Sequence, residues 1–266
     1  MTITAYSVGG TWGTWDDGFG ADTCRAVAAD PWDIIEAELL GTDIDFVRQG
    51  VAYPGSFGPV GGPADAPSYA ESVKRGVAEH IRLINTIPGK FITAGYSQGA
   101  ELVRRVQYEL AFGSLRHRRD DCLRVITFGD PACQPGEQIG DNISGWGISG
   151  FVMPPNPIPV HCYATRGDMY CTTPGGESGE NMRAVYRALT NLQIPLTGDL
   201  LSALIGNPGL VAQLIDLVTN PIGGIPALID SIRRLIDFAI TGAHGNYAWA
   251  VDAAVADLRA LAKTTY

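Results

Sequence analysis

The chain carries little positive charge, with 19 lysines and arginines against 28 aspartates and glutamates and a net charge of −9. No basic run interleaved with aromatic residues occurs along it, so a nucleic-acid partner is not expected. The basic cluster at residues 115–119 is short and is followed by Asp120 and Asp121. This cluster predicts a solvated helix end.

Long apolar runs are also absent. Residues 200–215 are uncharged, but a Gly-Asn-Pro-Gly break at 206–209 interrupts them, and the run is too short for a transmembrane helix. Residues 1–8 contain no basic segment and predict a first strand, with no secretory signal visible. We therefore expect either that a signal has been removed or that the protein leaves its cell by another route.

Cysteines are few, and none lies in a C-x-x-C pattern, so a structural zinc site is not expected. Their number is odd, which leaves at least one without a partner in the chain: Cys24, Cys122, Cys133, Cys162 and Cys171. Cys162 and Cys171 flank Asp168 and could cross-link the loop that carries it. The alternative is five reduced and mostly buried thiols, and the sequence leaves both interpretations open.

The composition, 45% hydrophobic and 18% charged over 266 residues, is typical of a globular protein. We expect a single α/β domain over residues 1–266. Strand-like runs lie at 2–8, 43–48, 90–94, 123–128 and 159–164. Helix-like runs lie at 30–41, from Ser68 to about 86, from Ala100 onward and at about 247–263. Strands that alternate with helices predict a mostly parallel central sheet flanked by helices.

Residues 178–242 differ from the rest of the chain because their apolar residues recur at helical spacing. They predict several short helices inserted before the C-terminal helix. These helices either pack on the body of the domain or form a cap whose apolar face receives a long acyl chain. Residues 50–66 are rich in glycine and proline and predict a loop that lines the cleft.

The sequence Gly95-Tyr96-Ser97-Gln98-Gly99 lies between a strand-like run and a helix-like run. This context is that of a nucleophile elbow, a tight turn that holds a serine in a strained backbone conformation and exposes its hydroxyl. The two glycines are expected where a side chain would collide with neighbouring backbone. We therefore predict that Ser97 is the nucleophile of an acyl-transfer reaction.

A serine nucleophile needs a base, and the base needs a carboxylate to orient it. In α/β-hydrolases the chain order is serine, acid, histidine, and His244 in a loop of small residues before the last helix fits this order. The other histidines fit it less well because His80 precedes the serine and lies in a helix-like run, His117 belongs to the charged cluster, and His161 lies inside a strand-like run.

Two aspartates that follow strand-like runs are candidates for the acid, Asp130 and Asp168. Asp168 is favoured because it follows the later strand, whereas Asp130 precedes a proline and can hold a turn. The oxyanion hole is expected to use the backbone N–H groups of Gln98 and Thr11. Chemistry of this kind needs no metal and no organic cofactor.

These residues together resemble the cutinase-like serine esterases and, more narrowly, the Lysin B proteins of phages that infect mycobacteria. The elbow at residues 95–100 is similar in both groups, and the segment Cys162–Cys171 looks like the cutinase disulfide loop that holds the catalytic aspartate. The Phe-Gly-Asp-Pro segment at 128–131 with Gln-Pro-Gly at 134–136, the Gly-Asp-Met-Tyr segment at 167–170 and the insertion at 178–242 resemble the phage proteins. The cysteine pair departs from that pattern and keeps the cutinase alternative open.

The resemblance implies an α/β-hydrolase that hydrolyses the ester between mycolic acids and arabinogalactan in the mycobacterial cell wall. It also implies an enzyme made in the host cytoplasm and released to the cell envelope during phage-mediated lysis, and we expect it to be a monomer. The alternative is a secreted cutinase or lipase acting on lipid or polyester substrates. The residues themselves support a serine esterase with an apolar acyl site.

Overall fold

The computed structural model describes residues 2–13, 45–58, 63, 65–140, 143–190 and 242–264. The helix expected at 30–41 and the part of the 178–242 insertion between residues 191 and 241 lie outside these ranges. So does the start of the strand expected at 43–48.

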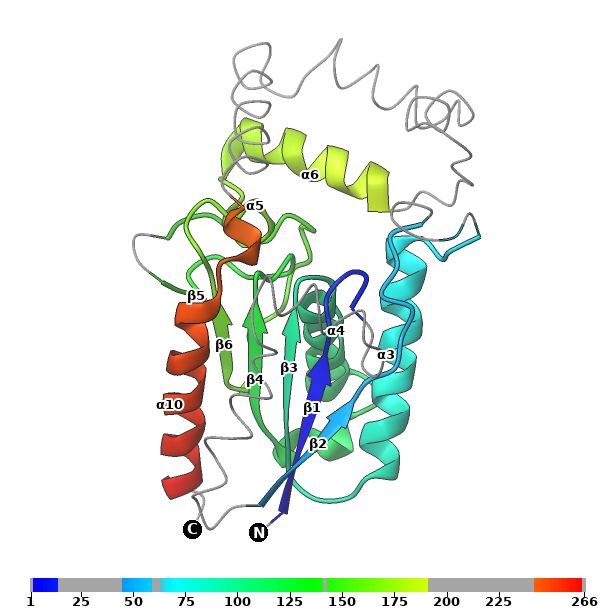
Figure 1. Ribbon diagram of the computed structural model, residues 1–266, viewed down its shortest axis with the longest axis vertical. Helices are drawn as coiled ribbons and strands as arrows, with labels where there is room; N and C mark the ends of the chain where they lie inside the picture. The colour runs from blue at the N-terminus through cyan, green and yellow to red at the C-terminus, as the bar shows by residue number, and fades with distance from the viewer. Residues whose placement is uncertain are drawn as a thin grey trace.

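Six parallel strands form one sheet, in the order β2-β1-β3-β4-β6-β5 (Figure 1). They are β1 (Thr2–Val8), β2 (Asp45–Gly50), β3 (Phe91–Tyr96), β4 (Cys122–Phe128), β5 (Gln138–Ile139) and β6 (Val160–Tyr163). The mostly parallel sheet predicted from the sequence is confirmed. The two-residue strand β5 was not predicted, because a run of that length shows no hydrophobic pattern.

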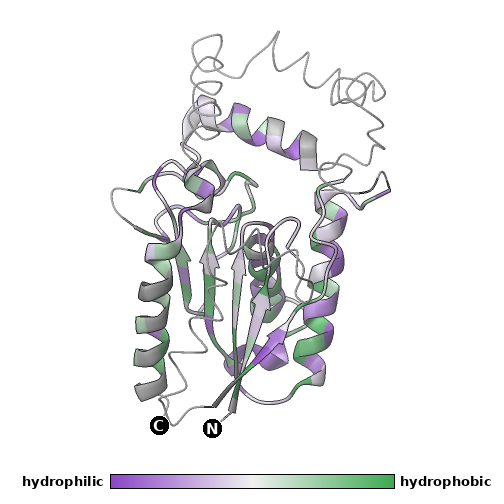
Figure 2. Cartoon of the chain, viewed as in Figure 1, coloured by the Kyte–Doolittle hydropathy of each residue, from purple (hydrophilic) through white to green (hydrophobic). Residues whose placement is uncertain are grey.

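Helices cover both faces of this sheet. Helices α3 (Tyr69–Thr86) and α4 (Gln98–Phe112) lie on one face, and α10 (Ala248–Thr264) lies on the other. Successive residues of the central strands point to opposite faces, so Phe91 packs in the core beneath α3 and α4 while Ile92 packs against α10. Hydrophobic segments, coloured green, are visible on β4 and on parts of α3 and α10 (Figure 2).

The start of α3 has the predicted cap. The hydroxyl oxygen of Ser68 accepts a hydrogen bond from the backbone N–H of Glu71 at 3.2 Å, which satisfies one of the free N–H groups at the helix start. The helix ends at Thr86, before Pro88 and Gly89. Its observed bounds agree with the predicted helix at 68–86.

The remaining elements lie mostly around the carboxyl ends of the strands. They are the 3-10 turns η1 (Arg116–Asp121) and η2 (Ala243–Gly245) and the helices α5 (Met169–Thr172) and α6 (Gly176–Thr190), of which η1 alone lies at the opposite end. Helix α6, the described start of the predicted insertion, crosses above the ends of the strands (Figure 1). Within the described residues, no helix combines the length and the apolar character needed to cross a bilayer.

Candidate active site

Ser97 lies in the turn between β3 and α4, with φ 57° and ψ −119°. A non-glycine residue with positive φ is strained, and the packing around the turn holds this one in place. A Cβ atom on Gly95 would overlap the backbone of Gly99, and one on Gly99 would overlap the carbonyl oxygens of Val8 and Gly9. The glycines of the motif therefore allow α4 to start directly against β1.

Three side chains that are distant in the sequence meet at this turn. Nε2 of His244 lies 2.8 Å from Oγ of Ser97, and Nδ1 of His244 lies 2.9 Å from Oδ2 of Asp168. An ionised carboxylate only accepts hydrogen bonds, so Nδ1 donates to Asp168 and Nε2 is left to accept the proton of the serine hydroxyl. The exposed fraction is 7% for Ser97, 0% for Asp168 and 20% for the side chain of His244.

Each of the three side chains comes from a different loop at the carboxyl edge of the sheet. Ser97 follows β3, Asp168 follows β6 and caps α5, and His244 lies in η2 just before α10. The second oxygen of Asp168, Oδ1, accepts a hydrogen bond from the backbone N–H of Tyr170 at 3.0 Å. The carboxylate is therefore held on both of its oxygens, which fixes the direction in which it faces the imidazole.

Gly129, directly after β4, leaves the space in which the imidazole and the carboxylate meet. Its φ is +57°, and a Cβ atom there would lie 2.9 Å from Cε1 of His244 and 3.0 Å from Oδ2 of Asp168. Gly129, the residue before Asp130, therefore leaves room for the contact between His244 and Asp168.

Three tyrosines contact the imidazole or the carboxylate beside it, and the sequence predicted no role for any of them. Tyr170 stacks on the ring of His244 with a centroid distance of 4.3 Å, and Tyr96 stacks on it at 5.1 Å. The Tyr247 hydroxyl donates to Oδ2 of Asp168. The available signal was proximity in sequence, since each tyrosine lies within three residues of a predicted site residue.

The other three histidines lie elsewhere. His80 is fully buried against Tyr6, and burial lowers its pKa to about 3. His117 is exposed in η1. His161 lies on β6, with Nδ1 3.3 Å from a carboxylate oxygen of Asp257 on α10.

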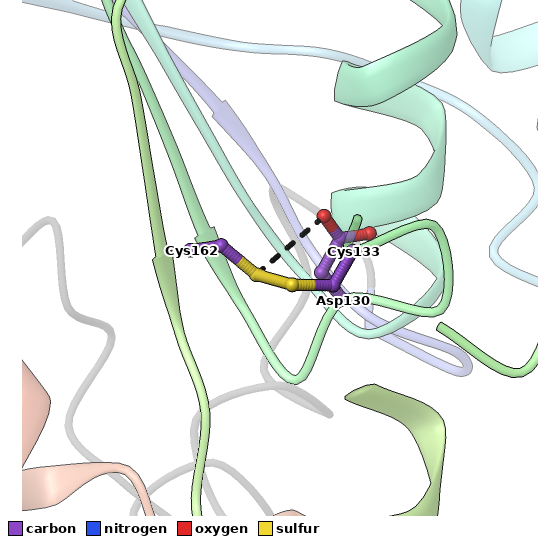
Figure 3. Close-up of side chains that lie close together, drawn as sticks. All are labelled: Asp130, Cys133 and Cys162. Carbon is purple, nitrogen blue, oxygen red and sulfur yellow. Dashed lines mark hydrogen bonds between the residues drawn. A yellow bond between two sulfur atoms is a disulfide. The ribbon is translucent and has the colours of Figure 1, made fainter. Parts of the chain in front are cut away.

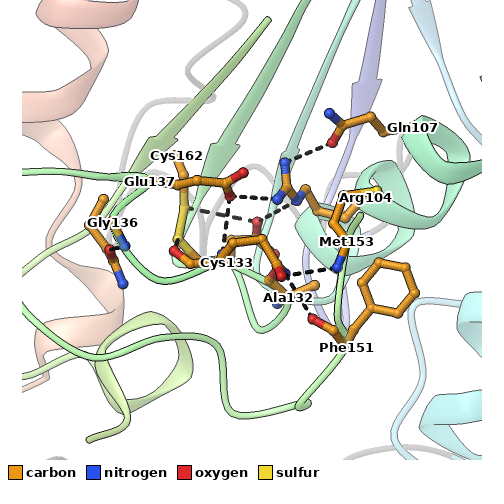
Figure 4. A network of polar contacts seen from close by, with 12 residues as sticks. Arg104, Gln107, Ala132, Cys133, Gly136, Glu137, Phe151, Met153 and Cys162 are labelled. Atoms are coloured by element: carbon orange, nitrogen blue, oxygen red, sulfur yellow. Dashed lines mark hydrogen bonds and ion pairs between the residues drawn. A yellow bond between two sulfur atoms is a disulfide. The ribbon is translucent and has the colours of Figure 1, made fainter. Parts of the chain in front are cut away.

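Asp130, the alternative acid, belongs to a separate buried network around Arg104, in which Arg104 also binds Gln107 and Glu137 (Figure 4). Oδ2 of Asp130 lies 3.4 Å from Nε of the buried Arg104, and its Oδ1 accepts from the N–H of Ala132 at 2.8 Å. Arg104 lies 2.5 Å from Glu137 and 2.7 Å from Gln107. Burial raises the pKa of Asp130 to about 6, although the charge of Arg104 opposes that shift. The network ties the elbow helix α4 to the loop after β4.

Neither of the two interpretations that the sequence left open is found, because Cys162 is not linked to Cys171 and the thiols are not all reduced. Cys162 forms a disulfide with Cys133, across 29 residues of sequence and a Cα–Cα distance of 6.6 Å (Figure 3). Cys171 is a buried free thiol, because α5 turns its Sγ toward the Tyr247 hydroxyl, 3.3 Å away. Asp130, Cys133 and Cys162 bring three potential metal ligands together, but the two sulfurs are bonded to each other and Arg104 pairs with the carboxylate.

Of the two residues expected to form the oxyanion hole, Gln98 belongs to the elbow and is the first residue of α4. Its buried side chain accepts a hydrogen bond from the Ser72 hydroxyl and donates one to the carbonyl of Ser56, both at 2.9 Å. Thr11 lies in the turn after β1. In that turn, a Cβ atom on Gly10 would lie 3.4 Å from Cβ of Ser97, so the turn directly adjoins this serine.

A cavity of about 570 Å³ opens between α3, α4 and α6 on the same side of the sheet as the elbow helix. Its lining combines apolar and aromatic side chains with a few charged ones: Tyr69, Ala70, Val73, Lys74, Val77, Glu101, Arg105, Tyr108, Glu109, Ser149, Phe151, Tyr186, Arg187 and Thr190. Tyr186 in this lining packs edge-on against Tyr170, whose ring stacks on His244. Tyr170 therefore contacts both a ring of the cavity lining and the imidazole, although Ser97 and His244 are not part of that lining. The loop of residues 51–58 packs against Gln98 and the turn after β1 and does not line this cavity.

The chain is similar to several known proteins. Residues 45–155 match the PE-PPE domain. The structure is similar to that of lysin B from Mycobacteriophage D29, with 25% sequence identity, a TM-score of 0.59, and coverage of 97% of this chain and 99% of that one. No curated protein sequence matches the chain.

Two further structures are more distant. An acetylxylan esterase has 16% identity and a TM-score of 0.47, covering 71% of this chain and 98% of its own. A cutinase-like protein from Cryptococcus sp. has 17% identity and a TM-score of 0.45, covering 72% of this chain and 89% of its own. The similarity to lysin B over almost the whole chain confirms the resemblance and the α/β-hydrolase fold expected from the sequence.

Proposed function

We propose that this protein is a lipolytic serine esterase in which Ser97 is the nucleophile, His244 the general base and Asp168 the residue that orients the base. The observation that supports this most directly is the unbroken hydrogen-bonded series from Ser97 through His244 to Asp168, at 2.8 Å and 2.9 Å. A nucleophile, its base and an orienting carboxylate at these distances are the geometric requirement for acyl transfer.

The reaction proceeds in two steps. Oγ of Ser97 attacks the ester carbonyl while Nε2 of His244 takes the hydroxyl proton, and the imidazolium then passes that proton to the departing alcohol. Water, deprotonated by the same nitrogen, next attacks the acyl-serine, and the imidazolium returns that proton to Oγ of Ser97 as the carboxylic acid leaves. Asp168 orients the imidazole and stabilises the imidazolium that forms in both steps.

In this proposal the backbone N–H groups of Gln98 and Thr11 stabilise the negative charge that develops on the carbonyl oxygen of the ester. The Gln98 N–H belongs to the first turn of α4, where free N–H groups and the helix dipole favour an anion.

The cavity between α3, α4 and α6 is the proposed site for the acyl chain. Its volume suits a long apolar group, and α6 places Tyr186 in its wall at the start of the predicted insertion. The proposed physiological substrate is the ester between mycolic acids and arabinogalactan, by analogy with lysin B. In this proposal the enzyme reaches the cell envelope at phage-mediated lysis and acts as a monomer.

The substrate is tested by mass analysis of lipids released from mycobacterial wall fragments, with Ser97→Ala as the inactive control. Free mycolic acid released only by the wild type supports the proposal. Hydrolysis of cutin or triglyceride with no mycolic acid released would instead favour the secreted cutinase or lipase alternative.

The acyl site is tested with Ala70→Trp, because Ala70 lines the cavity and is exposed on the first turn of α3. The indole should reduce turnover of p-nitrophenyl palmitate by about tenfold and leave the butyrate ester unaffected. His117→Trp, on the exposed turn η1, is the matched control and should change neither rate. Equal losses on both esters in Ala70→Trp would place the acyl chain elsewhere.

A further inference from the structure

Tyr247 contacts the acid of the proposed triad. Its hydroxyl donates to Oδ2 of Asp168, the same oxygen that receives the Nδ1–H of His244. Tyr247 is 3% exposed and Asp168 is 0% exposed, so neither group has free access to water. Burying a carboxylate is costly unless hydrogen bonds replace those it made to water. Among the described residues, the Tyr247 hydroxyl provides such a bond together with Nδ1 of His244 and the backbone N–H of Tyr170.

The direction of the phenol proton follows from the other contacts of its oxygen. The backbone N–H of Thr165 donates to the Tyr247 oxygen at 3.3 Å, and Sγ of Cys171 lies 3.3 Å from it. A backbone N–H only donates, and an ionised carboxylate only accepts. The phenol proton therefore points to Asp168. Burial also raises the pKa of Tyr247 well above its ordinary value, so this donor stays protonated over the working pH range of an esterase.

The same short segment supplies both donors to Oδ2. Tyr247 follows His244 by three residues, and η2 turns both side chains toward the loop after β6. A residue of that loop also binds this segment, since the Thr165 hydroxyl donates to the carbonyl of Asn246 at 2.6 Å. The segment 244–247 is thus joined to the loop after β6 both by its two donors to Oδ2 of Asp168 and by the Thr165–Asn246 hydrogen bond.

We propose that Tyr247 is a positioning residue for ester hydrolysis: its hydroxyl fixes the orientation of Asp168 and, through it, the orientation of the His244 ring. The inference rests on the proposed function, since it assigns a role within the same triad. Tyr247 does not reach the substrate. Its effect should therefore fall on the rate of the chemical steps and not on substrate binding.

The test compares Tyr247→Phe with Tyr163→Phe. Both tyrosines are buried in the core beneath α10, but the Tyr163 ring packs on Phe128 and Trp249, away from the carboxylate. Tyr247→Phe should lower kcat for p-nitrophenyl butyrate roughly tenfold with KM unchanged, because a hydrogen bond to a charged group is lost. Tyr163→Phe should leave both constants at the wild-type values.

A spectroscopic measurement separates positioning from a general loss of structure. The proton between His244 and Asp168 should give a downfield NMR signal that is missing in His244→Ala and displaced in Tyr247→Phe. Replacing Tyr247 with a fluorotyrosine keeps the hydroxyl and the fold while strengthening the donor, and should also move this signal.

An unchanged kcat together with an unmoved signal in the phenylalanine and fluorotyrosine proteins would overturn the inference. Equal losses of kcat in Tyr247→Phe and Tyr163→Phe would also overturn it, since a buried hydroxyl of either residue would then serve stability alone. Full activity of Ser97→Ala would instead refute the proposed function. The two failures are therefore distinguishable.

Discussion

Tyr96, the residue directly before Ser97, donates its hydroxyl proton to the backbone carbonyl of His244 at 2.6 Å. Its ring also stacks on the imidazole, with a centroid distance of 5.1 Å and an interplanar angle of 23°. The elbow that presents the proposed nucleophile therefore also holds the backbone of the proposed base. This contact bridges 148 residues of sequence and fixes the height of the histidine loop above the sheet.

Replacing Tyr96 separates the hydrogen bond from the stacking. Tyr96→Phe should lower kcat about fivefold, because one neutral hydrogen bond contributes roughly 1 kcal/mol. Tyr96→Ala, which also removes the ring, should lower it further. Steady-state kinetics on a soluble ester measures both variants. Identical kinetics for the wild type and both variants would show that the histidine loop is held without Tyr96.

Gly129→Ala should disturb the triad directly. The new Cβ would lie within 3.0 Å of both the imidazole and the carboxylate, and φ at this position is +57°. Displacement of the imidazole should reduce kcat/KM by about tenfold or more, since small misplacements of a catalytic group are costly. Gly175→Ala is the matched control, because a Cβ there has no neighbour within 4 Å and its φ is not positive. Wild-type kcat/KM in Gly129→Ala would contradict the observed packing.

His80 should make the protein less stable in acid. Unfolded, its imidazole binds a proton below a pH of about 6.5, whereas the folded protein resists protonation until about pH 3. The unfolded state thus binds more protons across this window, and stability should fall as the pH falls, by up to about 1.4 kcal/mol per pH unit. Urea unfolding at pH 7, 5 and 4 measures the slope.

The variant His80→Leu should show a shallower loss of unfolding free energy on the acid side than the wild type. His117→Leu removes an exposed histidine and should keep the wild-type slope. The same slope in all three proteins would mean that His80 accepts a proton in the folded state without penalty.

The Cys133–Cys162 disulfide should stabilise the fold against unfolding. It closes a loop with a sequence separation of 29, for which loop-closure entropy corresponds to about 3–4 kcal/mol. Cys133→Ser should lower the free energy of unfolding by an amount of this order, whereas Cys122→Ser, which removes a free thiol, should lower it less. Peptide mapping without reduction should recover residues 133 and 162 in one cross-linked fragment. A fragment that instead joins residues 162 and 171 would contradict the structure.

Much of this architecture was predictable because local sequence patterns indicate where its strands and helices begin and end. Apolar runs followed by helical spacing indicated the strands and helices, and Ser68 with Glu71 located the start of α3. The elbow was identifiable because two glycines and a serine at fixed spacing have few other uses between a strand and a helix. Chain order, together with the local context of each histidine, then separated His244 from the three others.

Contacts that depend on tertiary packing had no such signal. The tyrosine in Gly95-Tyr96-Ser97 occupies a variable position of the motif, so nothing indicated that it reaches His244. Cys171 is closer in sequence to Cys162 than Cys133 is, yet α5 turns its thiol toward Tyr247. The pairing of Cys133 with Cys162 depends on how the loop after β4 folds back beside β6, and sequence spacing does not determine that.

Active-site labelling followed by peptide mapping tests the central claim most directly. A fluorophosphonate probe should modify the wild-type protein once, on the peptide that contains Ser97. It should leave Ser97→Ala unmodified and react with His244→Ala at least about a hundredfold more slowly, because the hydroxyl then has no base. Modification of a different residue, or equally fast labelling of the wild type and His244→Ala, would contradict the account.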